Sequence, residues 1–249
     1  MKLRNPLTMQ GFIDQCWLFT FATPEQAARK LLPLELEPVV HRGAAFWNVV
    51  ICHIQAMRPL GAPAAFGLSY WHAAYRLYVR CYPEGQAPVE GLYFLRSDCN
   101  NPLIGAAGNL LTDFHFHTAR ITADMGADQT RLRIDSPDAP ARAVLDHTAA
   151  AVLPADSVFG SLEEAAAFLK YQPCGISVPE LGTVNLVRIR RDESAWRSRL
   201  VHVREAEWAF FADHEVRPEI CYQVEPIRYV WERGVTLPAG RRREPAPAG

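Results

Sequence analysis

The chain has 249 residues, of which 49% are apolar, and its 26 basic and 27 acidic side chains nearly cancel. A chain of this length can bury a substantial core within one domain, and its balanced charge excludes the basic surface that nucleic-acid binding requires. No apolar run reaches the roughly 18 residues of a membrane span, and no secretory signal is recognisable. We therefore expect a cytoplasmic protein that binds neither nucleic acid nor membranes.

The six cysteines are scattered along the chain and include no C-x-x-C pair. This distribution favours reduced thiols over a disulfide framework or a zinc knuckle. The cysteines are Cys16, Cys52, Cys81, Cys99, Cys174 and Cys221. No cofactor is expected, and the sequence leaves open whether the chain forms a homo-oligomer.

The first third of the chain predicts one helix and two long strands. Thr23 and Pro24 suit the cap and the first turn of a helix, which Pro33 would end. Residues 41–57 are rich in β-branched and aromatic side chains, which predicts one long strand or a pair of strands. Residues 68–81 are predicted to form a single strand.

The strand predicted at residues 68–81 has two different faces, because side chains alternate along a strand. One face is apolar and core-like, with Trp71, Ala73, Tyr75, Leu77, Val79 and Cys81. The other face carries Tyr70, His72, Ala74, Arg76, Tyr78 and Arg80. A mixture of aromatic rings with His72 and Arg76 is typical of a wall that meets a pocket or solvent.

The stretch that follows carries the densest polar chemistry of the chain. The predicted order is strand, turn, helix and strand, over residues 92–96, 97–101, 102–111 and 114–121. Asn101 before Pro102 is a helix-start signature, because proline needs no N–H in a first turn. Alternation along the last strand would place Asp113, His115 and His117 on one face.

The second half of the chain predicts further short strands, over residues 130–134, 182–191 and 197–204 and within 219–231. Residues 142–151 lie in an ambiguous segment and are given a helical interpretation. Ser161 and Glu164 form a capping box that opens another helix. One domain is expected over residues 1–236, and the proline-rich tail at residues 237–249 is expected to be disordered.

The order of these elements indicates the fold class. Eight or so strands, a few short helices and no alternating β–α–β rhythm predict an α+β fold. The fold would be built mostly on an antiparallel sheet that curls or closes on itself.

The central stretch also resembles a known superfamily. Gly108, Phe114 and the run Ala119-Arg120-Ile121 match a helix-ending glycine, a phenylalanine and a Leu-Ala-Arg-Ile-like run of the acetoacetate decarboxylase-like superfamily. With residues 68–80 and 91–94, the pattern is most similar to the YqjF-like bacterial branch, over about residues 11–234. The resemblance implies a cone-like antiparallel β-barrel with peripheral helices, and such a barrel tends to enclose a ligand cavity.

The chain departs from that superfamily where the decarboxylase carries two adjacent lysines. The resemblance places Phe116 and His117 at these positions, and a phenylalanine cannot form the imine that the first lysine forms. The only lysines of the chain are Lys2, Lys30 and Lys170. Schiff-base decarboxylation would require the fold to bring Lys170 into the pocket, so this chemistry is disfavoured.

Three functional interpretations remain open, and the first is an enzyme that works without an imine on a carbonyl or carboxylate compound. Its candidate catalytic residues are His117, His115, Arg76, His72 and Asp113. Histidine titrates near neutrality and can pass protons, and an arginine can hold a carboxylate by two parallel hydrogen bonds. By the resemblance, His72 stands where the YqjF-like branch often carries an acid.

The second interpretation is a pocket that binds a small molecule without chemistry. Candidate ligand-binding residues are Tyr70, Tyr78, Phe116 and Asp98. The third is a metal site made by Asp113, His115 and His117 on one strand face; their spacing alone is a weak signal, and no metal is assigned. The structural alternative for the two histidines is exposure to solvent or a hydrogen bond to the backbone.

Overall fold

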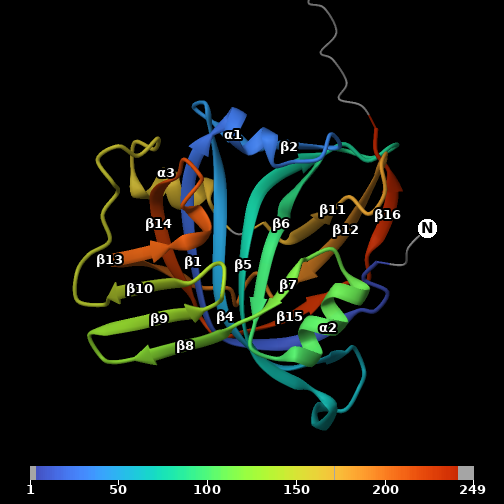
Figure 1. The fold of residues 1–249 in the computed structure, drawn as a ribbon, viewed down its shortest axis with the longest axis horizontal. Helices are drawn as coiled ribbons and strands as arrows, with labels where there is room; N and C mark the ends of the chain where they lie inside the picture. The colour runs from blue at the N-terminus through green and yellow to red at the C-terminus, as the bar shows by residue number, and fades with distance from the viewer. Residues whose placement is uncertain (1–3, 171, 241–249) are drawn as a thin grey trace, which may run out of the picture.

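The computed structural model describes residues 4–170 and 172–240. Most of these residues form strands, and the α-helices between them are short (Figure 1). The long strands are rich in β-branched and aromatic residues, whose side chains pack well on a pleated surface. The chain is therefore built mostly of β-sheet, as its sequence predicts.

The elements of the first half are β1 (Met9–Pro24), α1 (Glu25–Lys30), β2 (Leu36–Pro38), β3 (Val40–His41), β4 (Ala44–Pro59), η1 (Ala64–Phe66), β5 (Leu68–Cys81), β6 (Val89–Cys99), α2 (Pro102–Leu111), β7 (Phe116–Thr118) and β8 (Arg120–Met125). Those of the second half are β9 (Gln129–Asp135), β10 (Ala141–Asp146), α3 (Leu162–Phe168), β11 (Cys174–Ser177), β12 (Thr183–Arg190), β13 (Ser198–Trp208), η2 (Ala209–Phe211), β14 (Arg217–Val224), β15 (Ile227–Trp231) and β16 (Val235–Pro238).

Strand pairing closes part of the sheet into a ring. Hydrogen-bonded neighbours run from β4 through β5, β6, β11, β12 and β15 to β1, and β1 also pairs with β4. These pairs are antiparallel except for β6 with β11. The 16 residues of β1 are long enough to pair with β15 along the first half and with β14 along the second.

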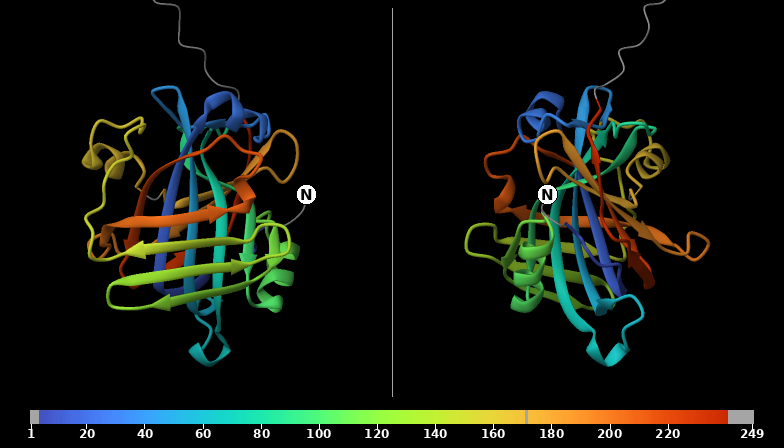
Figure 2. Two further views of the ribbon diagram at one scale, coloured as in Figure 1. Left: turned by 60° about the vertical axis from the view of Figure 1, so that its left-hand side comes forward. Right: turned by 90° about the vertical axis from the view of Figure 1, so that its right-hand side faces the viewer.

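A second layer covers the outer side of the ring. From β14 the sheet continues through β13, β10 and β9 to β8, and these strands run across β1, β4 and β5 (Figure 2, left). One apolar core lies between the layers and includes Trp17, Trp47, Tyr75, Leu132 and Ile134, all buried. A second core faces the inside of the ring and includes Ile13, Val50, Tyr78, Phe94 and Tyr222.

Several elements begin and end as their sequence predicts. β5 spans Leu68–Cys81, and its two faces belong to the two different cores. The side-chain oxygen of Asn101 accepts hydrogen bonds from the backbone N–H groups of Leu103 and Ile104 and so caps α2. Ser161 caps α3 by accepting from the N–H of Glu164.

Other predicted elements are wrong. Residues 142–151 form no helix: residues 142–146 belong to β10, because Ala141, Ala143 and Leu145 alternate into the core between the layers, and residues 147–151 form neither a helix nor a strand. Thr23 does not cap α1, since β1 continues through it and its hydroxyl donates to the carbonyl of Glu215. The strand predicted at residues 114–121 is divided into β7 and β8.

The C-terminal boundary also differs from the expected one. β16 continues past residue 236 and pairs with β12 as far as Pro238. The last residues of the predicted disordered tail, 241–249, lie outside the described part of the chain. Among the described residues, no helix is both long enough and apolar enough to cross a membrane.

Candidate functional site

A cavity of about 260 Å³ opens on the inner side of the ring. Its walls come from β1, β4, β5, β6, β12 and β15, and α2 with residues 5–9 closes it on another side. Apolar side chains make up most of the lining. The polar members of the lining are Asn5, Tyr70, His72, Arg76, Thr112, Tyr229 and Glu232.

Arg76 lies at the buried end of this cavity and is only 4% exposed. One nitrogen of its guanidinium donates to the side-chain oxygen of Asn48, and the group lies 5.5 Å from the centre of the Phe94 ring. Asn48 donates in turn to the hydroxyl of Tyr78 over 3.0 Å, which donates to the carbonyl of Leu169 over 2.8 Å. This chain of hydrogen bonds fixes the direction of Arg76.

His72 lies two side-chain repeats before Arg76 on the same face of β5. Its ring stacks on Phe116 with 5.5 Å between ring centres, and its buried Nε2 has no hydrogen-bond partner among the described residues. Burial, and then the positive charge of Arg76, lower the pKa of His72 to about 3. The ring is therefore neutral at physiological pH.

The cysteines and tyrosines of the wall are also neutral. Burial raises the pKa of the Cys16 thiol and of the Tyr229 hydroxyl to about 12, and it raises the pKa values of Cys52 and Tyr70 above their ordinary values. Within the described lining, Arg76 and Glu232 are the only charged side chains. Glu232 is 35% exposed and pairs with Arg190 over 2.6 Å.

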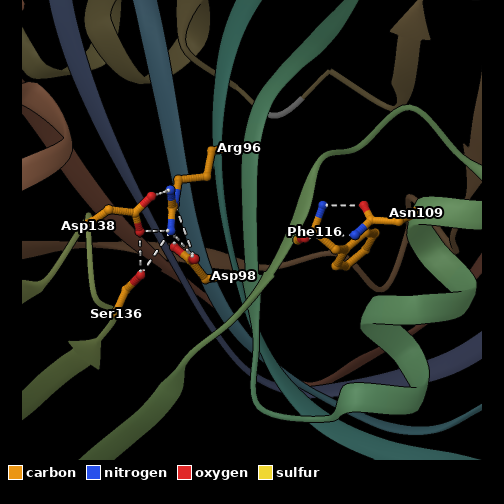
Figure 3. Close-up of polar contacts among 6 residues, drawn as sticks. All are labelled: Arg96, Asp98, Asn109, Phe116, Ser136 and Asp138. Atoms are coloured by element: carbon orange, nitrogen blue, oxygen red, sulfur yellow. Dashed lines mark hydrogen bonds and ion pairs between the residues drawn. The ribbon is translucent and has the colours of Figure 1, made fainter.

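Phe116 occupies the position that the superfamily resemblance gives to the imine-forming lysine. The amide of Asn109 on α2 accepts from the N–H of Phe116 over 2.7 Å and donates to its carbonyl over 2.8 Å (Figure 3). A Cβ on Gly108 would come within 2.4 Å of the ring, so this glycine is needed for the close approach of α2. The backbone of Phe116 is held from α2, and its ring forms part of the cavity wall.

The structure brings together four of the predicted site residues and separates the others. Tyr70, His72, Arg76 and Phe116 line the cavity, and Tyr78 lies behind Arg76 in the hydrogen-bond chain. The three side chains predicted to share one strand face are not in the lining: Asp113, His115 and His117.

The expectation that Asp113, His115 and His117 share one strand face is wrong. The chain is irregular before Phe116, and His115 has a φ of +52°, which breaks the alternation of a strand. His115 and His117 are exposed, and Asp113 pairs with Arg4 over 2.8 Å. Across residues 4–170 and 172–240, no group of three or more His, Cys, Asp or Glu side chains could hold a metal ion, so the predicted triad is not assembled.

Asp98 belongs to a separate polar cluster, buried except at Asp138, rather than to the cavity lining. Arg96 donates to Asp98 over 2.8 Å, to Ser136 over 2.8 Å and to Asp138 over 2.8 Å (Figure 3). Burial raises the pKa of Asp98 above its ordinary value, and Arg96 opposes this effect. Since Ser136 and Asp138 lie between β9 and β10, the cluster joins β6 of the ring to the second layer.

The lysines of the described chain stay away from the cavity. Lys170 is 52% exposed and lies 3.8 Å from Glu193 and 5.2 Å from the centre of the Trp196 ring. Lys30 is exposed at the end of α1. Lys2 lies outside the described residues.

Sequence reasoning missed the residues that support the site from behind. Asn48 and Asn109 are single amides in apolar or helical segments, and no spacing signal marks either one. Asn48 is hydrogen-bonded to Arg76, 28 residues away in the sequence, and Asn109 to Phe116, 7 residues away. Tyr229 lines the cavity from β15, which is part of the ring because it pairs with the first half of β1.

The neutral state of His72 predicts a specific loss of stability in acid. The folded chain keeps this ring neutral down to a pKa of about 3, whereas the unfolded chain takes up a proton below the ordinary value of 6.5. The unfolded state therefore binds more protons between these values, and the free energy of unfolding falls as the pH falls through 6.5. His72 alone can make the free energy of unfolding fall by at most about 1.4 kcal/mol for each pH unit.

Urea unfolding of the wild type and of His72→Gln, measured from neutral to mildly acidic pH, checks this expectation. The wild type should lose stability faster than the variant as the pH falls. Parallel curves for the two proteins would mean that the ring is already accessible to protons in the folded state.

Comparisons with known proteins bear on the family and the fold. A family model described as "DUF2071: Uncharacterized conserved protein (COG2071)" matches residues 13–232. No curated protein matches the chain.

Solved structures share the fold. An acetoacetate decarboxylase-like enzyme from Sphingomonas wittichii RW1 has a TM-score of 0.59 at 17% identity, covering 96% of this chain and 95% of that chain. Acetoacetate decarboxylase from Legionella pneumophila has a TM-score of 0.61 at 10% identity, covering 92% and 87%. The enduracididine biosynthesis enzyme MppR complexed with pyruvate has a TM-score of 0.55 at 13% identity, covering 93% and 90%. Such low identities show a shared fold and nothing about activity.

Proposed function

The chain belongs to the DUF2071 family, and we propose that it is a cytoplasmic protein that holds a small carboxylate or carbonyl compound in the cavity, beside Arg76 and His72. We also infer that the ring of strands is the cone-like β-barrel of the superfamily resemblance, and that the chain falls within its YqjF-like branch. The proposal includes no imine, because none of the lysines in the described chain lines the cavity.

One observation carries this proposal: an arginine lies at the buried end of a largely apolar cavity. Asn48 directs the guanidinium without adding a negative charge of its own. A planar guanidinium matches a carboxylate by two parallel hydrogen bonds, and such charge-assisted bonds are stronger away from water. In this arrangement His72 offers a second polar contact, and Tyr70 and Phe116 contribute the aromatic wall.

The structural relatives support a compound of this kind. MppR has been solved in complex with pyruvate, a small acid that carries both a carboxylate and a carbonyl group. The identity of 13% transfers no activity, so pyruvate serves here only as a guide to test compounds.

The most direct test is a calorimetric titration with α-ketoisocaproate, which combines a carboxylate, a carbonyl and an apolar body. We expect saturable one-to-one binding that Lys170→Ala leaves unchanged. Treatment with borohydride should leave the mass of the protein unaltered, because no imine is available to be reduced. A covalent adduct on a lysine, or loss of binding in Lys170→Ala, would overturn the lysine-independent proposal.

A second candidate function is proton transfer on the bound compound, favoured by the buried Nε2 of His72. A carboxylate bound near this ring would raise its pKa, because an opposite charge favours the protonated form. His72 would then exchange a proton at the carbon beside the carbonyl. In deuterated water such exchange removes the proton NMR signal of the carbon beside the carbonyl. An unchanged spectrum with intact binding would mean that the protein binds the compound without this proton transfer.

A further inference from the structure

The polarity of the cavity changes from its buried end to its mouth. Arg76 shares the lining with Cys16, Leu18 and Val224, each of which is at most 5% exposed. At the mouth, Leu7 is 50% exposed and still belongs to the lining. A ligand that follows this gradient has one polar end directed inward and an apolar body directed outward.

The charge at the buried end suits a single negative group. Cys16, Cys52 and Tyr70 remain neutral because burial raises their pKa values, and His72 remains neutral because burial and Arg76 lower its pKa. Arg76 is the only basic side chain of the described lining, and its other charged member, Glu232, is an acid that pairs with Arg190, so the lining offers no positive charge to a second carboxylate. A dianion is therefore a poor match for both ends.

The cavity is also larger than the shortest acids require. A volume of about 260 Å³ equals the space of roughly nine water molecules at about 30 Å³ each. A short acid such as pyruvate would leave apolar wall without contacts, and unfilled apolar space forfeits dispersion energy. An acid with a longer apolar body would fill it.

Helix α2 provides an apolar wall against which such a body can pack. Ile104, Ala107 and Leu111 on α2 belong to the lining. Met57 and Trp231 belong to it as well, so the lining includes a thioether and an indole ring besides the aliphatic side chains. Most of the contacts that the lining offers to the body of a ligand beside α2 are therefore apolar.

Resting on the proposed function, we infer that the ligand is an amphiphilic monocarboxylate with an aliphatic or aromatic body of about eight carbons. Its carboxylate meets Arg76 and His72 at the buried end, and its body extends past α2 towards the mouth. The same features predict weaker binding of short acids and of dicarboxylates.

A homologous series tests this inference with the intact protein. Titration with butanoate, hexanoate and octanoate should show about a fourfold gain in affinity for each added methylene, as expected for burial of apolar area. Octanedioate and octanol should each bind at least about tenfold more weakly than octanoate, since one adds a charge and the other removes it.

Two neighbouring alanines of α2 provide a matched pair of variants. Both Ala106 and Ala107 are exposed, but only Ala107 belongs to the cavity lining. Ala107→Trp should weaken octanoate binding by about tenfold and leave butanoate unaffected, whereas Ala106→Trp should change neither.

The outcomes separate this inference from the function on which it rests. If butanoate, octanoate and octanedioate bind equally well, and Arg76→Met abolishes the binding of all three, the inferred ligand class is wrong but the proposed carboxylate site at Arg76 is supported. If no acid binds, or if binding is the same in Arg76→Met, the proposed function itself fails and the ligand class fails with it.

Discussion

Arg96→Met is expected to lower the free energy of unfolding by about 3–5 kcal/mol. Arg96 is 6% exposed and Asp98 is fully buried, and their side chains meet over 2.8 Å. Removing the arginine leaves the carboxylate of Asp98 buried without its counter-charge, which costs far more than the loss of an exposed pair. Chemical denaturation followed by tryptophan fluorescence measures the change.

Two further variants identify the cause of that loss. Arg142→Met breaks the contact of Arg142 with Glu207, whose side chains are 64% and 69% exposed, and should change the stability little, because exposed ion pairs contribute little. Adding Asp98→Asn to Arg96→Met should restore part of the stability, because an amide leaves no charge buried. A small loss in Arg96→Met, similar to that in Arg142→Met, would mean that the cluster does not join the two layers.

Arg76→Met is expected to weaken binding of the cavity ligand by about 100-fold, since hydrogen bonds to a charged group contribute about 1.5–3 kcal/mol. Methionine keeps much of the length and apolar contact of the side chain but has no donors and no charge. Calorimetric titration of both proteins with octanoate measures the effect.

Arg76→Lys separates charge from geometry in the same experiment. A lysine keeps the positive charge but cannot make two parallel hydrogen bonds to a carboxylate, so its affinity should fall between those of the wild type and of Arg76→Met. Urea unfolding of each variant shows whether the protein remains folded. Wild-type affinity in Arg76→Met would remove this arginine from the site.

The side of the site that lies on one regular strand could be predicted from sequence. Alternation alone places Tyr70, His72 and Arg76 on one face of β5, and this face lines the cavity. The cap at Asn101 likewise fixes the start of α2, because its signature is local. Local periodicity and capping are sufficient where the backbone is regular.

The remaining part of the site depends on backbone geometry that periodicity does not encode. The alternation that would join His115 to His117 fails because His115 has a positive φ and the strand begins only at Phe116. Asn109 holds that strand by two hydrogen bonds from α2. Contacts of this kind arise from tertiary packing, and a single sequence gives no signal for them.

The helical interpretation of residues 142–151 fails for a related reason. Alanine-rich sequence favours a helix by intrinsic propensity, but Ala141, Ala143 and Leu145 also alternate, and the second layer buries that face. The buried face, which exists only once β9 and β13 lie on either side, decides the outcome.

A crystal structure of the protein with octanoate is the most direct test of the proposed site. We expect density for the acid inside the ring, with its carboxylate within hydrogen-bonding distance of the guanidinium of Arg76 and its chain directed along α2 towards Trp231. Density for the acid at the exposed His115 and His117, or an unchanged cavity at saturating octanoate, would contradict it.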